Sequence, residues 1–177
     1  DQVPHLELTR EIARRFNYFY GPTFPEPQAI LTETPKIPGI DGRKMSKSYN
    51  NAVFIADKPE EINKKILSMF TDPLRPYKKD PGHPDRCPVF SLHGVFTDAE
   101  TRNQIEKDCR GAIIGCKDCK AMLAKRVIEF LTPLREKREN ILKKPGLIWD
   151  ILEEGSKKAR EIASKTMEEV RQKVCTG

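Results

Sequence analysis

The sequence lacks any long apolar run. No stretch of its 177 residues approaches the roughly 20 consecutive apolar residues that a membrane-spanning helix needs. The first residues, Asp1 to His5, have neither the basic start nor the apolar middle of a secretory signal peptide, and no initiator methionine precedes them. We therefore expect a cytoplasmic chain that begins inside a longer one.

Internal repeats and low-complexity tracts are also absent, which excludes a repeat array. The chain has five cysteines, an odd number, and it has no secretory signal. This usage predicts reduced thiols or a metal site rather than a framework of disulfide bonds.

Charged residues are abundant. They make up 33% of the chain against 37% hydrophobic residues, and the net charge is +6 with an isoelectric point near 9.1. This composition is typical of a soluble, mostly helical protein that is long enough for one or two domains. The basic excess fits a polyanion as partner, although many domains without a role in nucleic-acid binding carry a similar charge.

The first 56 residues contain the pattern of a helix, a strand and a loop. Apolar residues recur at helical spacing over residues 5–16, and Gly and Pro predict a loop over residues 17–27. Residues 29–31 are short and apolar, and they predict a buried strand that residues 32–38 extend. Residues 39–51 are rich in Gly, Lys and Ser, so we expect a mobile loop. This region is typical of the end of an α/β unit.

Residues 57–177 are expected to be helical. From Cys116 onward the apolar spacing predicts helix, with a break at residues 144–146, where a proline and a glycine follow each other. Two earlier helices are expected to begin at capping patterns, each with a glutamate three residues after the capping residue. These patterns are Asp57 with Glu60, and Thr97 with Glu100.

Two lysines, Lys44 and Lys47, lie three residues apart in the expected loop. Ammonium groups on long stems can reach a polyphosphate and offset the charge that develops as pyrophosphate leaves. A mobile loop also allows closure only when substrate is bound. Because Lys-rich loops are common and usually only solvated, the charge by itself indicates no function.

The full string of this loop resembles a known signature. Residues 44–48, Lys-Met-Ser-Lys-Ser, match the KMSKS signature of the class I aminoacyl-tRNA synthetases without a departure. The flanking residues 37–42 and 49–51 are similar to the same loop in the tryptophanyl and tyrosyl enzymes. Residues 60–76 and 115–171 resemble the tryptophanyl enzymes more, and the similarity covers nearly all of the chain.

The resemblance implies a fold in two parts. Residues 1–56 would be the C-terminal part of a class I catalytic domain, an α/β nucleotide-binding (Rossmann-like) domain remnant that carries the KMSKS loop. Residues 57–177 would be a mostly α-helical anticodon-binding domain with a cysteine cluster.

The resemblance also implies a reaction, the ATP-dependent attachment of tryptophan to tRNA(Trp) through tryptophanyl-adenylate, with Mg²⁺ sharing the phosphate charge. Lys44 and Lys47 would be catalytic, Asp1 would bind the ribose, and Ile37 would lie against the adenine through its backbone. The implied ATP-binding residues are Asp1, Ile37, Lys44, Met45, Ser46, Lys47 and Ser48. The partners would be tRNA(Trp), tryptophan and ATP, with no membrane, and the whole enzyme would be a homodimer.

The HIGH motif of the family is not found in this sequence. The three histidines, His5, His83 and His93, all lie outside a His-x-Gly-His context. The tryptophan pocket of the family also lies mostly upstream. We therefore expect this stretch of chain to be incomplete as an enzyme and inactive by itself.

Four of the five cysteines form a second group, with 21, 6 and 2 residues between successive members: Cys87, Cys109, Cys116 and Cys119. Four thiolates can hold structural Zn²⁺ or a [4Fe–4S] cluster, and scattered inert thiols are the alternative. The spacing resembles that of tryptophanyl enzymes with a [4Fe–4S] cluster, although the first gap is shorter by one residue. We predict the cluster, with His83 as a candidate substitute for Cys87 and with Cys175 as a free thiol.

Three other interpretations are compatible with parts of the sequence. The first is a tyrosyl-tRNA synthetase, which the helical tail disfavours. The second is a non-catalytic, cluster-bearing tRNA-binding module, in which an intact KMSKS loop would be surplus. The third is a ferredoxin-like electron carrier, which the basic charge and the long helical tail disfavour.

Overall fold

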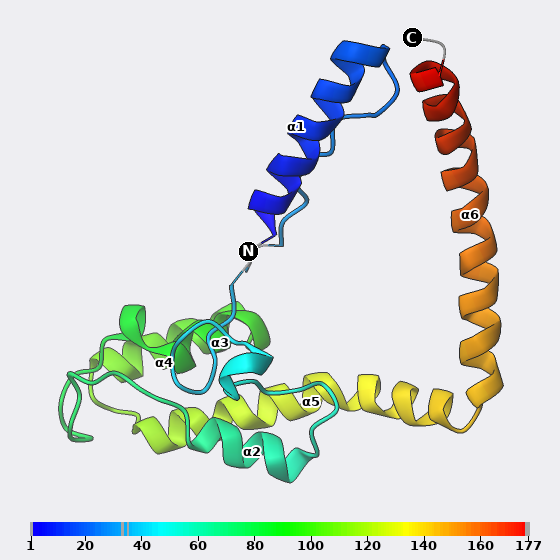
Figure 1. Cartoon of the computed structure of the whole chain (residues 1–177). Coiled ribbons are helices and arrows are strands. Elements are labelled where there is room, and N and C mark those ends of the chain that lie inside the picture. The colour runs from blue at the N-terminus through cyan, green and yellow to red at the C-terminus, as the bar shows by residue number, and fades with distance from the viewer. Residues whose placement is uncertain (1, 33, 35, 176–177) are drawn as a thin grey trace. The chain divides into compact units, whose positions relative to one another are not determined.

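The computed structural model describes residues 2–32, 34 and 36–175, in which helices are the main regular elements and long loops connect them (Figure 1). Asp1 lies outside the described residues. The helices, in chain order, are α1 (Val3–Tyr20), η1 (Lys47–Tyr49), α2 (Pro59–Leu67), η2 (Pro84–Arg86), α3 (Pro88–Phe96), α4 (Ala99–Arg110), α5 (Cys116–Leu142) and α6 (Pro145–Cys175), of which η1 and η2 are short 3₁₀ helices. The chain divides into two compact units, residues 33–140 and residues 1–32 with 141–177.

The unit of residues 33–140 has its core between α2, α3 and α5. Ile62 and Ile66 on α2 lie four residues apart, so both face the same side of that helix. They pack with Leu92 of α3 and with Leu123 and Val127 of α5. Each of these side chains is nearly or fully removed from solvent, which contributes about 1.5–3 kcal/mol per residue.

Two helices begin one or two residues later than the capping patterns predict. The α2 helix is capped at Lys58, whose N–H donates to the Glu61 carboxylate at 3.0 Å, while Asp57 accepts from Lys65 Nζ instead. The α4 helix is capped by Asp98, whose carboxylate accepts from the Thr101 N–H at 2.8 Å. The predicted caps at Asp57 and Thr97 are therefore wrong, since the neighbouring residues make these bonds.

The expected strand at residues 29–31 is wrong. No strand occurs among residues 2–32, 34 and 36–175, and the Ile30 side chain is 97% exposed. A strand needs a paired neighbour for its backbone, and here Pro38 and Lys44 form one isolated bridge. The helical half of the fold prediction is confirmed, whereas the described residues do not show an α/β sheet.

The remaining helix predictions are confirmed. The helix expected over residues 5–16 is α1, and the helix expected from Cys116 is α5 followed by α6. The break occurs at residues 143–144, and Pro145 opens α6, where its missing N–H leaves no bond unmade. The helix α3 lies within the stretch expected to be helical, although the sequence gives no separate bounds for it.

The unit of residues 1–32 and 141–177 contains α1 and α6. The Asn17 side chain holds the turn after α1, since its Oδ1 accepts from Thr23 and Phe24 N–H and its Nδ2 donates to Phe24 O. From α6, Lys173 Nζ donates to Pro22 O at 2.6 Å and to Thr23 Oγ1 at 2.8 Å. These bonds tie the end of α6 to the turn after α1.

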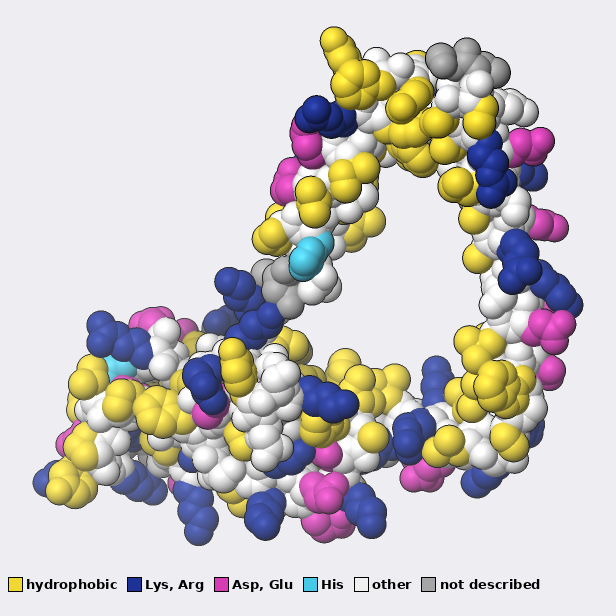
Figure 2. Space-filling model, in the orientation of Figure 1, with side chains coloured by type: hydrophobic (Ala, Val, Ile, Leu, Met, Phe, Trp, Pro, Cys, Tyr) yellow, Lys and Arg dark blue, Asp and Glu magenta, His cyan; other side chains and the backbone are white. Residues whose placement is uncertain are grey.

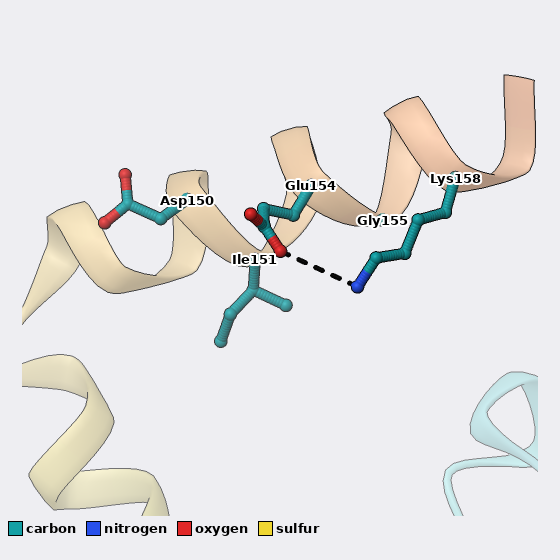
Figure 3. A pocket seen from close by; sticks show the side chains of 5 residues that line it. All are labelled: Asp150, Ile151, Glu154, Gly155 and Lys158. Carbon is teal, nitrogen blue, oxygen red and sulfur yellow. Dashed lines mark ion pairs between the residues drawn. The ribbon is translucent and has the colours of Figure 1, made fainter. Parts of the chain in front are cut away.

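Hydrophobic side chains gather over the first turns of α6, and oppositely charged side chains follow along the helix (Figure 2). Figure 3 shows a hollow on this helix, lined by Asp150, Ile151, Glu154, Gly155 and Lys158. Glu154 and Lys158 form an ion pair at 3.6 Å across one helical turn. All five residues come from one helix, so the hollow brings no distant groups together.

Among the described helices, none is long and apolar enough to cross a membrane.

Candidate functional site

Residues 37–45 form a tight turn that carries Lys44, the first lysine of the KMSKS string, and Lys47 follows it at the start of η1. The Met45 N–H donates to Ile37 O at 2.9 Å, and the Gly39 N–H donates to Arg43 O at 2.7 Å. The turn reverses at Gly42, whose φ of +81° is a conformation that glycine adopts without strain. The backbone therefore brings Lys44 back beside Pro38, within one short, hydrogen-bonded unit.

The side chain of Asn51 closes this turn from inside. Asn51 is only 2% exposed, and its Oδ1 accepts from the Ser46 N–H at 2.8 Å. Its Nδ2 donates to Asp41 Oδ1 at 2.7 Å and to Lys44 O at 3.1 Å. One side chain thus binds three positions of the turn, and both N–H donors of its amide are used.

Further contacts order the outer side of the turn. The Arg43 guanidinium pairs with the Asp41 carboxylate at 2.7 Å and lies over the Tyr49 ring at 4.6 Å. Ser46 caps the short helix η1, since its hydroxyl accepts from the Ser48 N–H. The Asn51 hydrogen bond is the largest cause that holds the pKa of the Asp41 carboxyl below its usual range. Asp41 therefore stays ionised beside the guanidinium.

The predicted ATP-binding residues divide into two groups. Lys44, Lys47 and Ser48 are exposed, as an approach to phosphate requires, whereas Ile37, Met45 and Ser46 are half-buried. The Ile37 and Met45 side chains line an apolar cavity of about 370 Å³ with residues of α2, α3 and α5. The structure therefore gathers the residues of the KMSKS string on one turn. Asp1, the last of the predicted ATP-binding residues, lies outside the described residues.

The four grouped cysteines lie around one small cavity of about 20 Å³, although they come from different elements. Cys87 precedes α3, Cys109 lies near the end of α4, and Cys116 and Cys119 lie on the first turn of α5. The backbone at Gly82 lies close to Cys109. Only glycine allows this contact, because a Cβ atom at residue 82 would overlap Cys109 Sγ. The tertiary structure thus brings together the four cysteines that the sequence singled out.

A buried arginine shares this cavity. Arg75 is 7% exposed, and its Nη1 lies 3.7 Å from Cys109 Sγ and 4.0 Å from Cys116 Sγ. Its Nη2 donates to the carbonyl oxygens of Lys78 and Ile114. Within the described part of the chain, Arg75 Nε is buried without a hydrogen-bond partner. A buried cation with an unused donor beside four sulfur atoms indicates a place for negative charge.

Burial favours the neutral form of two of the thiols, Cys109 and Cys119. Burial, together with the neighbouring cysteines, raises the pKa of the Cys119 thiol to about 12. Burial also raises the pKa of the Cys109 thiol, against the effect of Arg75. Behind Cys119 lies His93, fully buried, with Nε2 3.2 Å from Cys119 O and 3.5 Å from its Sγ. Burial lowers the pKa of His93, which keeps this imidazole neutral at physiological pH.

None of the five cysteines, all of which are described, is in a disulfide bond, as the sequence predicts. Across the described residues, no group of three or more His, Cys, Asp or Glu side chains is arranged as a ready metal site. His83 instead pairs its Nδ1 with the buried Asp72 carboxylate at 2.7 Å. Cys175 is exposed at the end of α6, in the other compact unit.

Sequence reasoning missed Asn51, Arg75 and His93. Nothing in the local sequence marks a single Asn or Arg as buried, because their burial depends on contacts between distant segments.

The basic residues near the cysteines differ from one another in their surroundings. Lys120 Nζ donates to Leu67 O at 3.1 Å, and Arg110 pairs with surface carboxylates.

Known proteins resemble this chain over most of its length. A family model described as tRNA synthetases class I (W and Y) matches residues 1–132. The chain is 60% identical over 172 residues to a tryptophan–tRNA ligase of Aquifex aeolicus, a match that covers 97% of this chain and 44% of the relative. It is 51% identical over 172 residues to that of Thermotoga maritima, covering 97% of this chain and 52% of the relative. The chain therefore spans about half the length of these curated relatives.

A solved structure agrees with the sequence comparisons. It is the tryptophanyl-tRNA synthetase of Campylobacter jejuni, complexed with ADP and tryptophan. The TM-score is 0.76 at 31% identity, and the match covers 98% of this chain and 54% of that chain. Since the family model matches residues 1–132 of 177, this chain belongs to the class I tRNA synthetases of the tryptophan and tyrosine family.

Proposed function

We propose that this chain supplies the KMSKS loop and the anticodon-binding part of an enzyme that attaches tryptophan to tRNA(Trp). The observation that carries the proposal is the turn of residues 37–51, which exposes Lys44 and Lys47 on a hydrogen-bonded frame. Relatives that are 60% and 51% identical are tryptophan–tRNA ligases, which supports tryptophan as the amino acid. Residues 57–177 would then be the anticodon-binding domain.

The residues of the turn would act on the phosphates of ATP. In the first step the carboxylate of tryptophan attacks the α-phosphorus, which gives tryptophanyl-adenylate and releases pyrophosphate. Lys44 and Lys47 would hold the β- and γ-phosphates and offset the charge that develops on pyrophosphate. Mg²⁺, when bound with ATP, would neutralise part of the same charge. The terminal adenosine of the tRNA then takes the aminoacyl group in the second step.

Binding of ATP and inorganic tripolyphosphate to this chain tests the loop assignment. We expect Lys44→Ala and Lys47→Ala each to weaken binding by about 10- to 100-fold, because each removes a charge-assisted contact worth about 1.5–3 kcal/mol. Lys64→Ala, which removes an exposed lysine from α2, is the matched control and should bind like the wild type. Equal binding by all variants would contradict the assignment.

Transfer RNA distinguishes tryptophan from tyrosine as the substrate. The chain is expected to bind a tRNA(Trp) transcript more tightly than a tRNA(Tyr) transcript, measured by filter binding at one fixed salt concentration. Preference for tRNA(Tyr) would favour the tyrosyl enzyme instead. Binding of tRNA(Trp) with no binding of ATP or tripolyphosphate would favour a non-catalytic tRNA-binding module. That the whole enzyme is a homodimer stays a prediction. Light scattering, which measures the molar mass in solution, would test it.

We propose in addition that Cys87, Cys109, Cys116 and Cys119 hold a [4Fe–4S] cluster, with structural Zn²⁺ as the alternative. The donor set fits, since the four cysteines line one cavity and Arg75 supplies a buried positive charge beside them. The cavity of about 20 Å³ has room for one ion, so a cluster would require the residues that line it to move apart. When bound, either group would cross-link three segments, namely the residue before α3, the end of α4 and the start of α5, and would stabilise the helical domain.

Metal analysis of protein purified without oxygen tests this second proposal. About four iron and four sulfide per chain would support the cluster, and one zinc per chain would support the alternative. Absence of both, after anaerobic reconstitution with iron and sulfide or with zinc, would contradict a four-thiolate centre. None of these results would alter the assignment of the KMSKS loop.

A further inference from the structure

The Asn51 side chain connects the first half of the KMSKS string, at Lys44 and Ser46, to the turn before it. It accepts from Ser46 N–H inside the string, and it donates to the carbonyl oxygen of Lys44 and to the Asp41 carboxylate. Its own backbone oxygen accepts from the Ile40 N–H at 2.9 Å. Four hydrogen bonds therefore converge on one buried residue that lies outside the string.

This arrangement fixes the backbone on both sides of Met45. Lys44 O and Ser46 N–H belong to the residues that flank Met45, and both bond to the same amide group. The amide can therefore satisfy both only when the backbone between them keeps this conformation. The side chains of Lys44 and Lys47 leave the backbone within three residues of each other, so their positions relative to each other depend on that conformation.

The surroundings leave the Asn51 side chain little freedom. Gly39, also buried, lies so close that a Cβ atom there would overlap the Asn51 amide. The Ile40 carbonyl accepts from Phe70 N–H at 2.7 Å, which ties the turn to the residues after α2. The amide is thus held by the core of the unit, while the lysines lie in solvent.

We propose that Asn51 is a positioning residue for Lys44 and Lys47, which holds them in one arrangement for the polyphosphate group of a nucleotide. This inference rests on the proposed function of the KMSKS loop, and it assigns a role to a residue outside that string. Asn51 itself does not touch the phosphates. It acts through the backbone of the residues that do, and it is itself buried, with both donors of its amide in hydrogen bonds.

Two substitutions separate positioning from packing. Asn51→Ala removes all three side-chain hydrogen bonds. Asn51→Asp keeps the shape and the bond from Ser46 N–H, but it places an acceptor against Asp41 and the Lys44 carbonyl, where like charges repel. We expect both variants to bind inorganic tripolyphosphate about tenfold more weakly than the wild type, which corresponds to about 1.4 kcal/mol. An Asn51→Asp variant that binds like the wild type would show that the residue only fills space.

The matched control is Asn63→Ala, because Asn63 is exposed on α2 and should leave the affinity unchanged. A double-mutant cycle with Lys47→Ala gives the second test. In that background Asn51→Ala should weaken binding by clearly less than tenfold, since Asn51 acts through the lysine that is already missing. An equally large loss in both backgrounds would overturn the inference.

The state of the turn itself is measured by NMR on the same 177-residue chain. In Asn51→Ala the Ser46 amide is expected to exchange with solvent faster, and the pKa of Asp41 is expected to rise toward its usual value. Unchanged exchange and titration would overturn the inference whatever the binding result. If Lys44→Ala and Lys47→Ala bind tripolyphosphate like the wild type, the loop function fails instead. The Ser46 exchange then still decides whether Asn51 fixes the turn.

Discussion

A Cβ atom at Gly39 would overlap the side chain of Asn51 and would lie 2.8 Å from the Asn51 backbone oxygen. The absence of a side chain at Gly39 is therefore what allows the buried amide to reach Asp41, Lys44 and Ser46. Because backbone and a buried amide cannot move aside easily, even one methyl group at this position should disturb the turn.

Gly39→Ala is therefore expected to destabilise the protein by about 1–3 kcal/mol, which is the usual range for overpacking. Thermal unfolding followed by circular dichroism measures the change. Gly155→Ala is the control of opposite sign, since Gly155 lies inside α6 with nothing within 4 Å of the added atom. It should stabilise the helix by about 0.5–1 kcal/mol. A neutral result at Gly39 would mean that the turn can open at little cost.

Arg75→Met is expected to weaken retention of the proposed metal centre. The variant loses the cation beside Cys109 and Cys116, and it leaves the carbonyl groups of Lys78 and Ile114 without their donor. Iron or zinc bound to the reconstituted protein should be lost to a chelator several times faster than from the wild type. Arg110→Met provides the comparison, because Arg110 follows Cys109 in sequence but pairs with surface carboxylates. Equal loss rates in the two variants would argue against a role for Arg75.

Replacing one cysteine at a time tests which cysteines belong to the proposed metal site. Cys116→Ser is expected to lower the metal content after reconstitution to a small fraction of the wild-type value, since one of four thiolates is missing. Cys175→Ser should leave the content unchanged, because Cys175 is exposed at the end of α6. Metal analysis of both variants in parallel gives the answer, and a full content in Cys116→Ser would remove this residue from the proposed site.

Asp72 links stability to pH. Its burial raises the pKa of the carboxyl, but hydrogen bonds from the Leu74 N–H and from His83 outweigh this effect and hold the pKa below its usual value. A carboxyl with a lowered pKa in the folded state adds stability above its unfolded pKa of about 3.9, and that stability is lost as the pH falls through the folded pKa.

The wild type should therefore lose stability below about pH 4 more steeply than Asp72→Asn. At neutral pH the variant should be less stable by about 1–3 kcal/mol, since an amide cannot accept from both donors as the carboxylate does. Urea unfolding at a series of pH values measures both effects. Parallel pH profiles for the two proteins would show that Asp72 does not carry this dependence.

The sequence by itself determined the local features of this protein. Helical spacing located α1, α5 and α6, the Pro145 and Gly146 pair located the break between the last two, and the string of residues 44–48 identified the loop. Each of these signals depends on neighbours a few residues apart, so it can be read without knowing the fold. The expected strand at residues 29–31 failed because pairing in a sheet depends on segments far away in the chain, and those segments are helices or turns here.

Only the tertiary structure decided which polar side chains become buried. Asn51 and Arg75 look like ordinary surface residues in the sequence, yet one closes the KMSKS turn and the other lies beside four thiols. The sequence named the four cysteines from their spacing, but their meeting at one cavity depends on the packing of α3, α4 and α5. Burial and the direction of a hydrogen bond are properties of contacts between distant segments, so no local pattern specifies them.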